Sequence, residues 1–262
     1  MSTVNTLLTI WLTAAWVMAG GWAWQRRKRN AGIVDALWAA GLAVAAVFAA
    51  LVGQGATSSR LWVALLGGAW GARLALHLWR RVRSEPEDGR YRQLRAHWHG
   101  HQGKFFGFFQ FQAFLVGVCA VPFIAVAANG VGPGLWVVPA VITWIVSVAG
   151  ESLADRQLAR FRADPVNHGR TCRDGLWRYS RHPNYFFEWL HWFTYVFLAV
   201  GSPLGWLAWI GPVLMFVFVR YVSGVPLTEA QAVRTRGDDY RRYQRDTPVL
   251  IPWFPMHTRE DV

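Results

Sequence analysis

The stretch RYSRHPNYFFEW, Arg178 to Trp189, places cationic and polar residues directly before a run of aromatic residues that contains a glutamate. Arg170 lies a few residues upstream, and Arg181 and His182 lie within the stretch. Pro183 suits the first turn of a helix. Guanidinium groups and the free N–H groups of a helix start both bind phosphate or carboxylate. The pattern therefore predicts an anion-binding site where an apolar helix begins.

Other side chains in this region favour a larger ligand than a simple anion. Trp177, Tyr179 and Tyr185 offer flat surfaces on which a base or ring can stack. Asn184 and Glu188 are four residues apart, so they share a face of the expected helix. Arginine and aromatic residues alone would also suit an anchor that meets lipid headgroups. That alternative does not explain why Asn184 and Glu188 continue into the apolar segment.

The composition is that of a membrane protein. The chain has 262 residues, of which 53% are hydrophobic and 16% are charged, whereas about a quarter of the residues of a soluble domain are charged. Apolar runs close to the roughly 20 residues that a transmembrane helix needs recur along the sequence. We expect an all-α polytopic membrane protein in which residues 1–262 form one helical bundle.

Seven spans are predicted, and their polar connections set the expected orientation. The spans cover about residues 4–24, 33–52, 61–79, 105–127, 135–160, 184–200 and 206–222. The connections after the first, third and fifth spans, and the tail after the seventh, are rich in Arg and Lys, while the others hold only Arg60 or no such residue. Cytoplasmic loops carry this excess, so the N-terminus is expected outside and the C-terminus inside. The first span reads as retained and not as a signal peptide.

The net charge of +12 does not indicate nucleic-acid binding, because the arginines cluster at the ends of apolar segments and form no continuous basic face. The two cysteines, Cys119 and Cys172, suggest neither a disulfide framework nor a metal site. A Walker loop, a GxGxxG fingerprint and an HExxH motif are all missing from the sequence. We expect no metal and no obligate protein partner, and any nucleotide would bind within a helical bundle.

Several charged residues lie inside or at the ends of spans. Insertion of a charged side chain into the centre of a membrane helix costs about 2.5–3.5 kcal/mol, so such residues usually have a structural or functional role. Asp35 starts the second span and is either a helix-start carboxylate paired with an interfacial arginine or a hydrogen-bonding acid that faces a cavity. Arg73 and His77 share a face of the third span, and a structural ion pair or a satisfied buried histidine is an open alternative to a catalytic role. Asp155 and Arg162 lie on a predicted helical extension of the fifth span, which could simply be solvated.

The segment DGLWRYSRHPNYFFEW resembles the C-terminal signature of the steroid 5-alpha-reductase superfamily, in particular its bacterial membrane branch. VDALW (34–38), EPEDGRY (85–91) and GVPLTEAQAVRTRGDDYRRYQRDTPVLIPWFP (224–255) support the resemblance, which covers most of the chain. It implies a seven-span reductase that uses NADPH to saturate the carbon–carbon double bond of an enone, such as a 3-oxo-4-ene steroid. The apolar substrate would enter from the lipid, and the cofactor site would face the cytoplasm of a bacterial inner membrane.

The resemblance also implies roles for particular residues. Asp155 and Arg162 match positions on the fifth helix that bind the cofactor. Arg170, Tyr179, Asn184 and Glu188 match positions that line the same pocket. In animal members, a glutamate on the second helix and a tyrosine on the third hold the substrate carbonyl, and Asp35 and His77 align with them. Aspartate for glutamate and histidine for tyrosine keep a hydrogen-bonding pair but change its reach. We therefore predict that Asp35 and His77 are catalytic.

Two other functions remain open. Membrane methyltransferases of the isoprenylcysteine and phospholipid type, which use S-adenosylmethionine, resemble this chain at Arg181–Pro183, Glu229 and Tyr240–Pro252. Glu229 and Tyr240 are accordingly included among the predicted cofactor-binding residues. The arginine-rich loop and Asn184 favour the dinucleotide. A non-enzymatic lipid-binding or scaffolding protein, whose arginine loop only meets headgroups, is the third possibility.

Overall fold

The computed structural model describes residues 1–255, and every regular element within that range is a helix. The predicted all-α class is confirmed. Contacts divide the chain into two compact units. Unit 1 comprises residues 1–140 and 195–211, and unit 2 comprises residues 141–194 and 212–262. Each unit is described by itself below.

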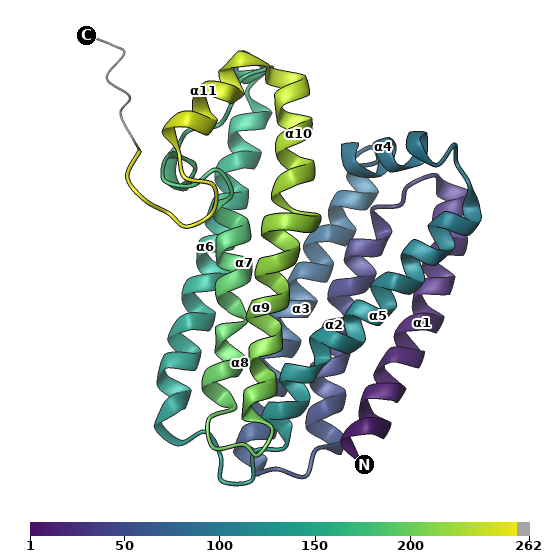
Figure 1. The fold of residues 1–262 in the computed structure, drawn as a ribbon, viewed down its shortest axis with the longest axis vertical. Coiled ribbons are helices and arrows are strands. Elements are labelled where there is room, and N and C mark those ends of the chain that lie inside the picture. Colours follow the sequence, from purple (N-terminus) through teal and green to yellow (C-terminus); the bar gives the residue numbers. More distant parts are fainter. Residues whose placement is uncertain (256–262) are drawn as a thin grey trace. The chain divides into compact units, whose positions relative to one another are not determined.

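Four long helices build most of unit 1. Its elements are α1 (Thr3–Lys28), α2 (Ile33–Val52), α3 (Thr57–Ser84), α4 (Gly89–His97), α5 (Gln102–Ala127), η1 (Gly134–Trp136), η4 (Gly205–Trp209) and most of α8 (Phe193–Leu198). Helix α2 packs against α1, α3 and α5 (Figure 1). A Cβ atom on Gly71 of α3 would lie 2.9 Å from the backbone oxygen of Ala39 on α2. The small residue therefore lets the two helix backbones approach closely, as is common between membrane helices.

Unit 2 is organised around a short helix that contacts three others. Its elements are α6 (Val137–Ala163), η2 (Pro165–Asn167), η3 (Gly175–Arg178), α7 (Pro183–His191), α9 (Ile210–Val217), the π-helix η5 (Phe218–Val222), α10 (Val225–Arg236) and α11 (Asp238–Asp246). Helix α7 packs on α6, where the Phe187 ring fills the space left by Gly150. Its Trp189 indole donates to the Pro212 carbonyl of α9 at 3.0 Å. The start of α7 is thereby held in a defined position.

Six segments are long and apolar enough to cross a membrane: α1, α2, α3, α5, Gly134–Ala163 and Gly205–Arg236. The chain is therefore an integral membrane protein. The predicted second span coincides with α2, and the predicted helical extension of the fifth span is confirmed because α6 continues to Ala163. The predicted sixth span consists of two short helices, α7 and α8, separated at Trp192. The count of seven spans and the orientation of the termini stay predictions.

The loop between α6 and α7 folds back on α6. Gly175 has φ +58°, a conformation that favours glycine, and a side chain there would also collide with Gln157 of α6. The Leu176 N–H donates to the Gln157 side chain at 2.9 Å, and the Trp177 indole donates to the Ala154 carbonyl at 2.9 Å. The DGLW motif thus fixes the path of the chain towards Pro183.

Candidate functional site

Asn184 and Asp155 meet where α7 begins. The Asn184 side-chain amide donates to Asp155 Oδ1 at 3.2 Å, and both side chains are partly exposed. The predicted neighbours in the cofactor pocket thus come together from α6 and α7, although 29 positions separate them in the chain. Glu188, one turn further along α7, is also partly exposed. The three residues form a polar lining on two packed helices.

The start of α7 offers fewer free N–H groups than a usual helix N-terminus. Pro183 has no N–H group, the His182 N–H is taken by the Ser180 hydroxyl oxygen at 3.1 Å, and the Tyr185 N–H is taken by Asn184 Oδ1 at 3.0 Å. A phosphate group bound here would therefore depend mainly on side-chain cations.

Such cations are present on the chain leading into α7. Arg162, Arg170 and Arg178 all have exposed side chains. Tyr179, which follows Arg178, is 37% exposed. Arg173 is engaged differently, because it pairs with Asp239 of α11 at 2.9 Å. The side chains of Arg162, Arg170 and Arg178 are therefore accessible to an anionic ligand.

Arg181 lies in an interior network and holds the loop to the C-terminal helices. Its Nε donates to Glu229 of α10 at 2.7 Å, and the two side chains are only 12% and 15% exposed. It also donates to the Thr247 carbonyl at 3.0 Å. Gln244 of α11 donates to the other Glu229 oxygen at 2.7 Å, and burial, together with the Glu229 charge, raises the pKa of Tyr240.

His182 belongs to the same network. Its Nε2 lies 3.2 Å from Glu229 Oε1, and its ring is stacked on Tyr185 with the ring centroids 5.3 Å apart. Burial lowers the pKa of His182 below that of an ordinary histidine, although the hydrogen bond to Glu229 opposes this shift. The Tyr185 hydroxyl in turn hydrogen-bonds to Thr228 of α10 at 3.1 Å. Loop, α7 and α10 are therefore cross-linked by polar contacts.

Direct contact with a cofactor stays a prediction for Arg181, His182, Glu229 and Tyr240. The polar groups of Arg181, His182 and Glu229 already bond to one another or to the backbone, and Tyr240 is 3% exposed. Trp177 is 7% exposed and packs into the core of unit 2, so its ring is not presented on the surface. Tyr179 is the aromatic residue of this loop with an exposed ring suitable for stacking.

Asp35 in unit 1 has a tyrosine partner that the sequence did not indicate. The Tyr91 hydroxyl of α4 donates to Asp35 Oδ1 at 2.6 Å, and Arg90 lies 3.4 Å from Oδ2. Tyr91 is 6% exposed, and burial, together with the Asp35 charge, raises its pKa well above the usual value. The ion pair between Asp35 and an arginine, which was one of the two predicted roles of Asp35, is thus present with Arg90. The neutral hydroxyl of Tyr91 also contacts the carboxylate.

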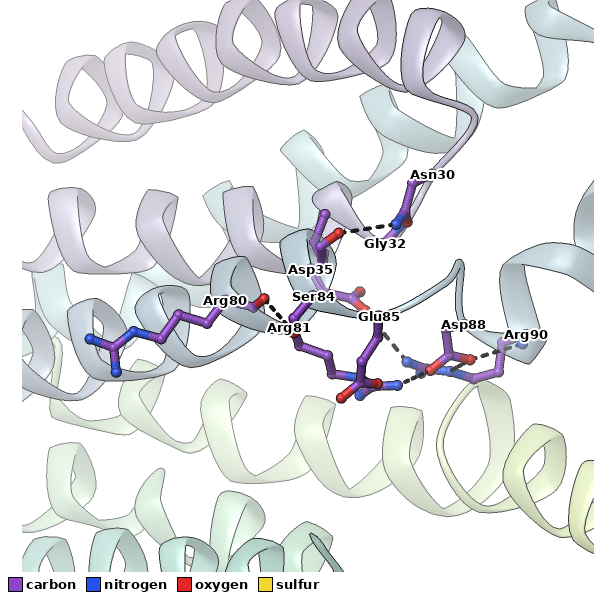
Figure 2. Close-up of polar contacts among 10 residues, drawn as sticks. Asn30, Gly32, Asp35, Arg80, Arg81, Ser84, Glu85, Asp88 and Arg90 are labelled. Carbon is purple, nitrogen blue, oxygen red and sulfur yellow. Dashed lines mark hydrogen bonds and ion pairs between the residues drawn. The ribbon is translucent and has the colours of Figure 1, made fainter. Parts of the chain in front are cut away.

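The loop between α3 and α4 covers this pair and is held by a cluster of charges. Asp88 pairs with Arg81 of α3 and with Arg90, and Arg81 also lies 3.3 Å from Glu85 (Figure 2). Burial raises the pKa of Asp88, but Arg90 and Arg81 outweigh it and lower the pKa to about 2. The cleft that Asp35, Asp88 and Tyr91 share has a volume of about 20 Å³, which is room for about one water molecule. The cleft itself is therefore too small for a larger ligand, although the Asp35 side chain is 32% exposed.

His77 and Arg73 also belong to unit 1. Both lie on α3, where His77 is exposed and Arg73 is partly exposed. The α3 residues that line the cleft beside Asp35 are Leu78, Arg81 and Val82. The predicted pairing of His77 with Asp35 around one substrate therefore stays a prediction, and Tyr91 is the residue in contact with Asp35.

A family model described as "Protein of unknown function (DUF1295)" matches residues 21–247. The chain belongs to the DUF1295 family. The match covers most of both units and includes Asp35, Tyr91, Asn184 and Glu229. No curated protein and no solved structure matches the chain.

The residue types did not predict that Tyr91 and Gln244 of this DUF1295 protein belong to the two polar clusters. Tyr91 lies in a polar stretch that was expected to be a loop, and Gln244 lies in the polar tail. A signal for the helix that carries Tyr91 was Asp88, a preferred N-cap residue, whose Oδ1 accepts a hydrogen bond from the Arg90 N–H at 2.9 Å. An N-cap before GRYRQLRAH predicts the short helix α4 that carries Tyr91 inward.

Asp88→Asn is expected to loosen the α3–α4 loop. Asp88 is 21% exposed, and its lowered pKa corresponds to roughly 2 kcal/mol of stabilisation of the charged form. Amide hydrogen exchange in residues 85–91 should therefore accelerate by about tenfold or more, without a comparable change in unit 2. Asp174→Asn, at an exposed position of unit 2, is the matched control. Unchanged exchange in residues 85–91 would mean that the ion pairs of Asp88 do not hold the loop.

Proposed function

We propose that this protein is an integral membrane reductase that uses NADPH to saturate the carbon–carbon double bond of an apolar enone, with a 3-oxo-4-ene steroid as a plausible substrate. The observation that carries the proposal is the contact between Asn184 and Asp155 at the start of α7, on a chain segment that carries exposed arginines. The resemblance of the same segment to the steroid 5-alpha-reductase signature supports the choice of reaction.

The residues of unit 2 fit a dinucleotide phosphate better than a small uncharged ligand. Exposed guanidinium groups bind phosphate oxygens with two hydrogen bonds each, and Arg162 and Arg170 supply such groups. Asn184, Asp155 and Glu188 offer both donors and acceptors to the polar parts of the cofactor. Arg181, His182, Glu229 and Tyr240 would maintain the shape of the pocket by holding the loop to α10 and α11.

NADPH, when bound, supplies the hydride for the reduction. The task of the substrate-binding residues is to stabilise the negative charge that develops on the carbonyl oxygen. Asp35 accepts hydrogen bonds from Tyr91 and Arg90, and an ionised carboxylate has no proton to donate. The donor to the carbonyl would therefore be the Tyr91 hydroxyl, whose single proton must turn from Asp35 to the substrate oxygen when the α3–α4 loop opens. Opening of the α3–α4 loop would admit the substrate from the lipid, because the cleft beside Asp35 is too small for an enone ring.

Membrane placement follows the positive-inside rule. The arginine-rich connections put the cofactor-binding loop on the cytoplasmic side, where NADPH is available. We propose the inner membrane of a bacterium as the location.

Thermal unfolding of the detergent-purified protein tests the cofactor. NADPH at about 100 times its dissociation constant should stabilise the native state by about 2.7 kcal/mol, and the shift should shrink in Arg170→Ala and Asn184→Ala. Arg27→Ala, which removes an exposed arginine of α1, is the matched control and should retain the shift.

S-adenosylmethionine is tested in parallel because the stretch from Arg181 to Pro183 and Glu229 also resemble membrane methyltransferases. Stabilisation by S-adenosylmethionine alone would replace the reductase proposal with methyl transfer. Stabilisation by neither compound would favour a non-enzymatic lipid-binding protein.

A further inference from the structure

The segment after α11 carries an apolar surface that the proposed reaction does not use. Ile251, Trp253 and Phe254 are 57%, 69% and 71% exposed, whereas Leu250 beside them is 2% exposed. The Trp253 and Phe254 rings contact each other with centroids 6.3 Å apart, and Phe254 meets the exposed Tyr179 ring at 6.0 Å. Three residues, Ile251, Trp253 and Phe254, are called the aromatic tip below. Exposed apolar groups gathered in this way mark a surface that binds a partner.

The aromatic tip is fixed to the rest of unit 2 by backbone hydrogen bonds. The Arg181 N–H donates to the Pro248 carbonyl at 2.9 Å, and the Trp253 N–H donates to the Tyr179 carbonyl at 2.9 Å. The Ser180 hydroxyl donates to the Leu250 carbonyl at 2.7 Å. In Figure 1 the yellow chain leaves α11 and returns beside the teal loop. The exposed rings are therefore presented by a braced segment.

The bracing also lowers the cost of placing this backbone in an apolar environment. A free N–H group is expensive to remove from water. Pro252 and Pro255 have no N–H group, and the N–H group of Trp253 is already bonded. Two of the four residues from 252 to 255 thus lack a donor, and a third has its donor satisfied.

The position of the tip relative to the apolar helices indicates which partner it meets. The segment that carries the tip forms hydrogen bonds with residues 179–181. Helix α7, which opens an apolar segment, begins at Pro183, two residues after Arg181. In a chain that crosses a bilayer, a surface so close to the start of an apolar helix lies at the depth of the lipid headgroups. Trp and Tyr are enriched at that depth.

A positive charge beside the tip fits an anionic headgroup layer. Arg178 is exposed and precedes Tyr179, whose ring contacts Phe254. A cation near an anionic membrane surface is attracted to it. We propose that the aromatic tip inserts into the headgroup region of the bilayer that the protein spans, with Arg178 contacting anionic lipid.

Spin-label accessibility in the full-length protein tests this insertion. The native Cys119 and Cys172 are buried and can be replaced by alanine, so a nitroxide can be attached at Trp253→Cys alone. The matched control is Asp238→Cys, at a side chain of unit 2 that is 84% exposed. Both are reconstituted into vesicles of phosphatidylcholine and phosphatidylglycerol, and collisions with oxygen, which partitions into the bilayer, are compared with collisions with a water-soluble nickel chelate.

We expect the ratio of oxygen to nickel collisions to be several-fold higher at position 253 than at position 238. Ile251→Cys should give the same result, which guards against a local effect of losing the tryptophan. Equal ratios at positions 253 and 238 would overturn the proposal. A label at 253 that neither reagent reaches would also overturn it, because a second copy or another protein would then cover the tip. The result does not depend on whether the protein is a reductase.

Discussion

Asp35→Asn and Tyr91→Phe are each expected to lower turnover of the proposed enone reduction by about two orders of magnitude or more, while NADPH affinity stays unchanged. One preoriented donor to a developing oxyanion is worth about 10²–10³ in rate. Tyr91→Phe removes the hydroxyl, and Asp35→Asn removes the carboxylate that accepts its hydrogen bond at 2.6 Å. Because both residues belong to unit 1 and the proposed cofactor residues belong to unit 2, the two functions are expected to separate in the variants.

The measurement is substrate-dependent oxidation of NADPH by the reconstituted protein, with a panel of enones that includes a 3-oxo-4-ene steroid. NADPH-induced thermal stabilisation is recorded for each variant. Tyr221→Phe and Asp164→Asn, both at exposed positions, are matched controls and should keep full turnover. His77→Phe is measured alongside, because the sequence resemblance assigns the second donor to His77. A large loss in His77→Phe together with full activity in Tyr91→Phe would return the role to the histidine.

A purely structural role for the pair makes a different prediction. Asp35 and Tyr91 tie α2 to α4, so their loss could lower the melting temperature alone. If folded Asp35→Asn and Tyr91→Phe proteins turned over at the normal rate, neither residue would belong to the mechanism. The comparison of rate with melting temperature therefore distinguishes the two roles.

The spans could be predicted because one physical requirement sets their length. An apolar helix must cover the hydrocarbon thickness, and the predicted span 33–52 accordingly coincides with α2. The same argument fails where a helix is interrupted: the apolar pattern of residues 184–200 does not show that α7 ends at His191 and that α8 begins at Phe193. Hydropathy averages over the segment, whereas the break occurs at one residue, Trp192, which is fully buried.

The polar elements were less predictable because their structure depends on contacts far along the chain. Arg181 and Glu229 are 48 positions apart, and Asp35 and Tyr91 are 56 positions apart. The spacing of residues within a helix says nothing about such pairs. Asn184 and Asp155 were placed together by the family resemblance, and their hydrogen bond is consistent with that placement. The cofactor that they would bind stays a prediction.

Glu229→Ala is expected to destabilise unit 2 by about 3 kcal/mol, because the removal of one partner from a largely buried ion pair leaves an uncompensated charge. Arg181 would lose its acceptor at 2.7 Å, and His182 and Gln244 would lose theirs at 3.2 and 2.7 Å. The midpoint of thermal unfolding should fall by about 10 °C. Asp238→Ala, whose carboxylate is largely exposed, should change the midpoint by far less, since exposed pairs contribute about 0–1 kcal/mol.

The double variant Arg181→Met/Glu229→Leu tests whether the unpaired charge is the cause. Replacement of a buried ion pair by apolar groups of similar volume is often close to neutral, so this variant should be more stable than Glu229→Ala despite the additional change. Arg181 also donates to the Thr247 carbonyl at 3.0 Å, and the loss of that bond limits the recovery. A double variant no more stable than Glu229→Ala would instead mean that hydrogen bonds between the loop, α10 and α11 supply the stability, and that the charge of Arg181 is well tolerated without its partner.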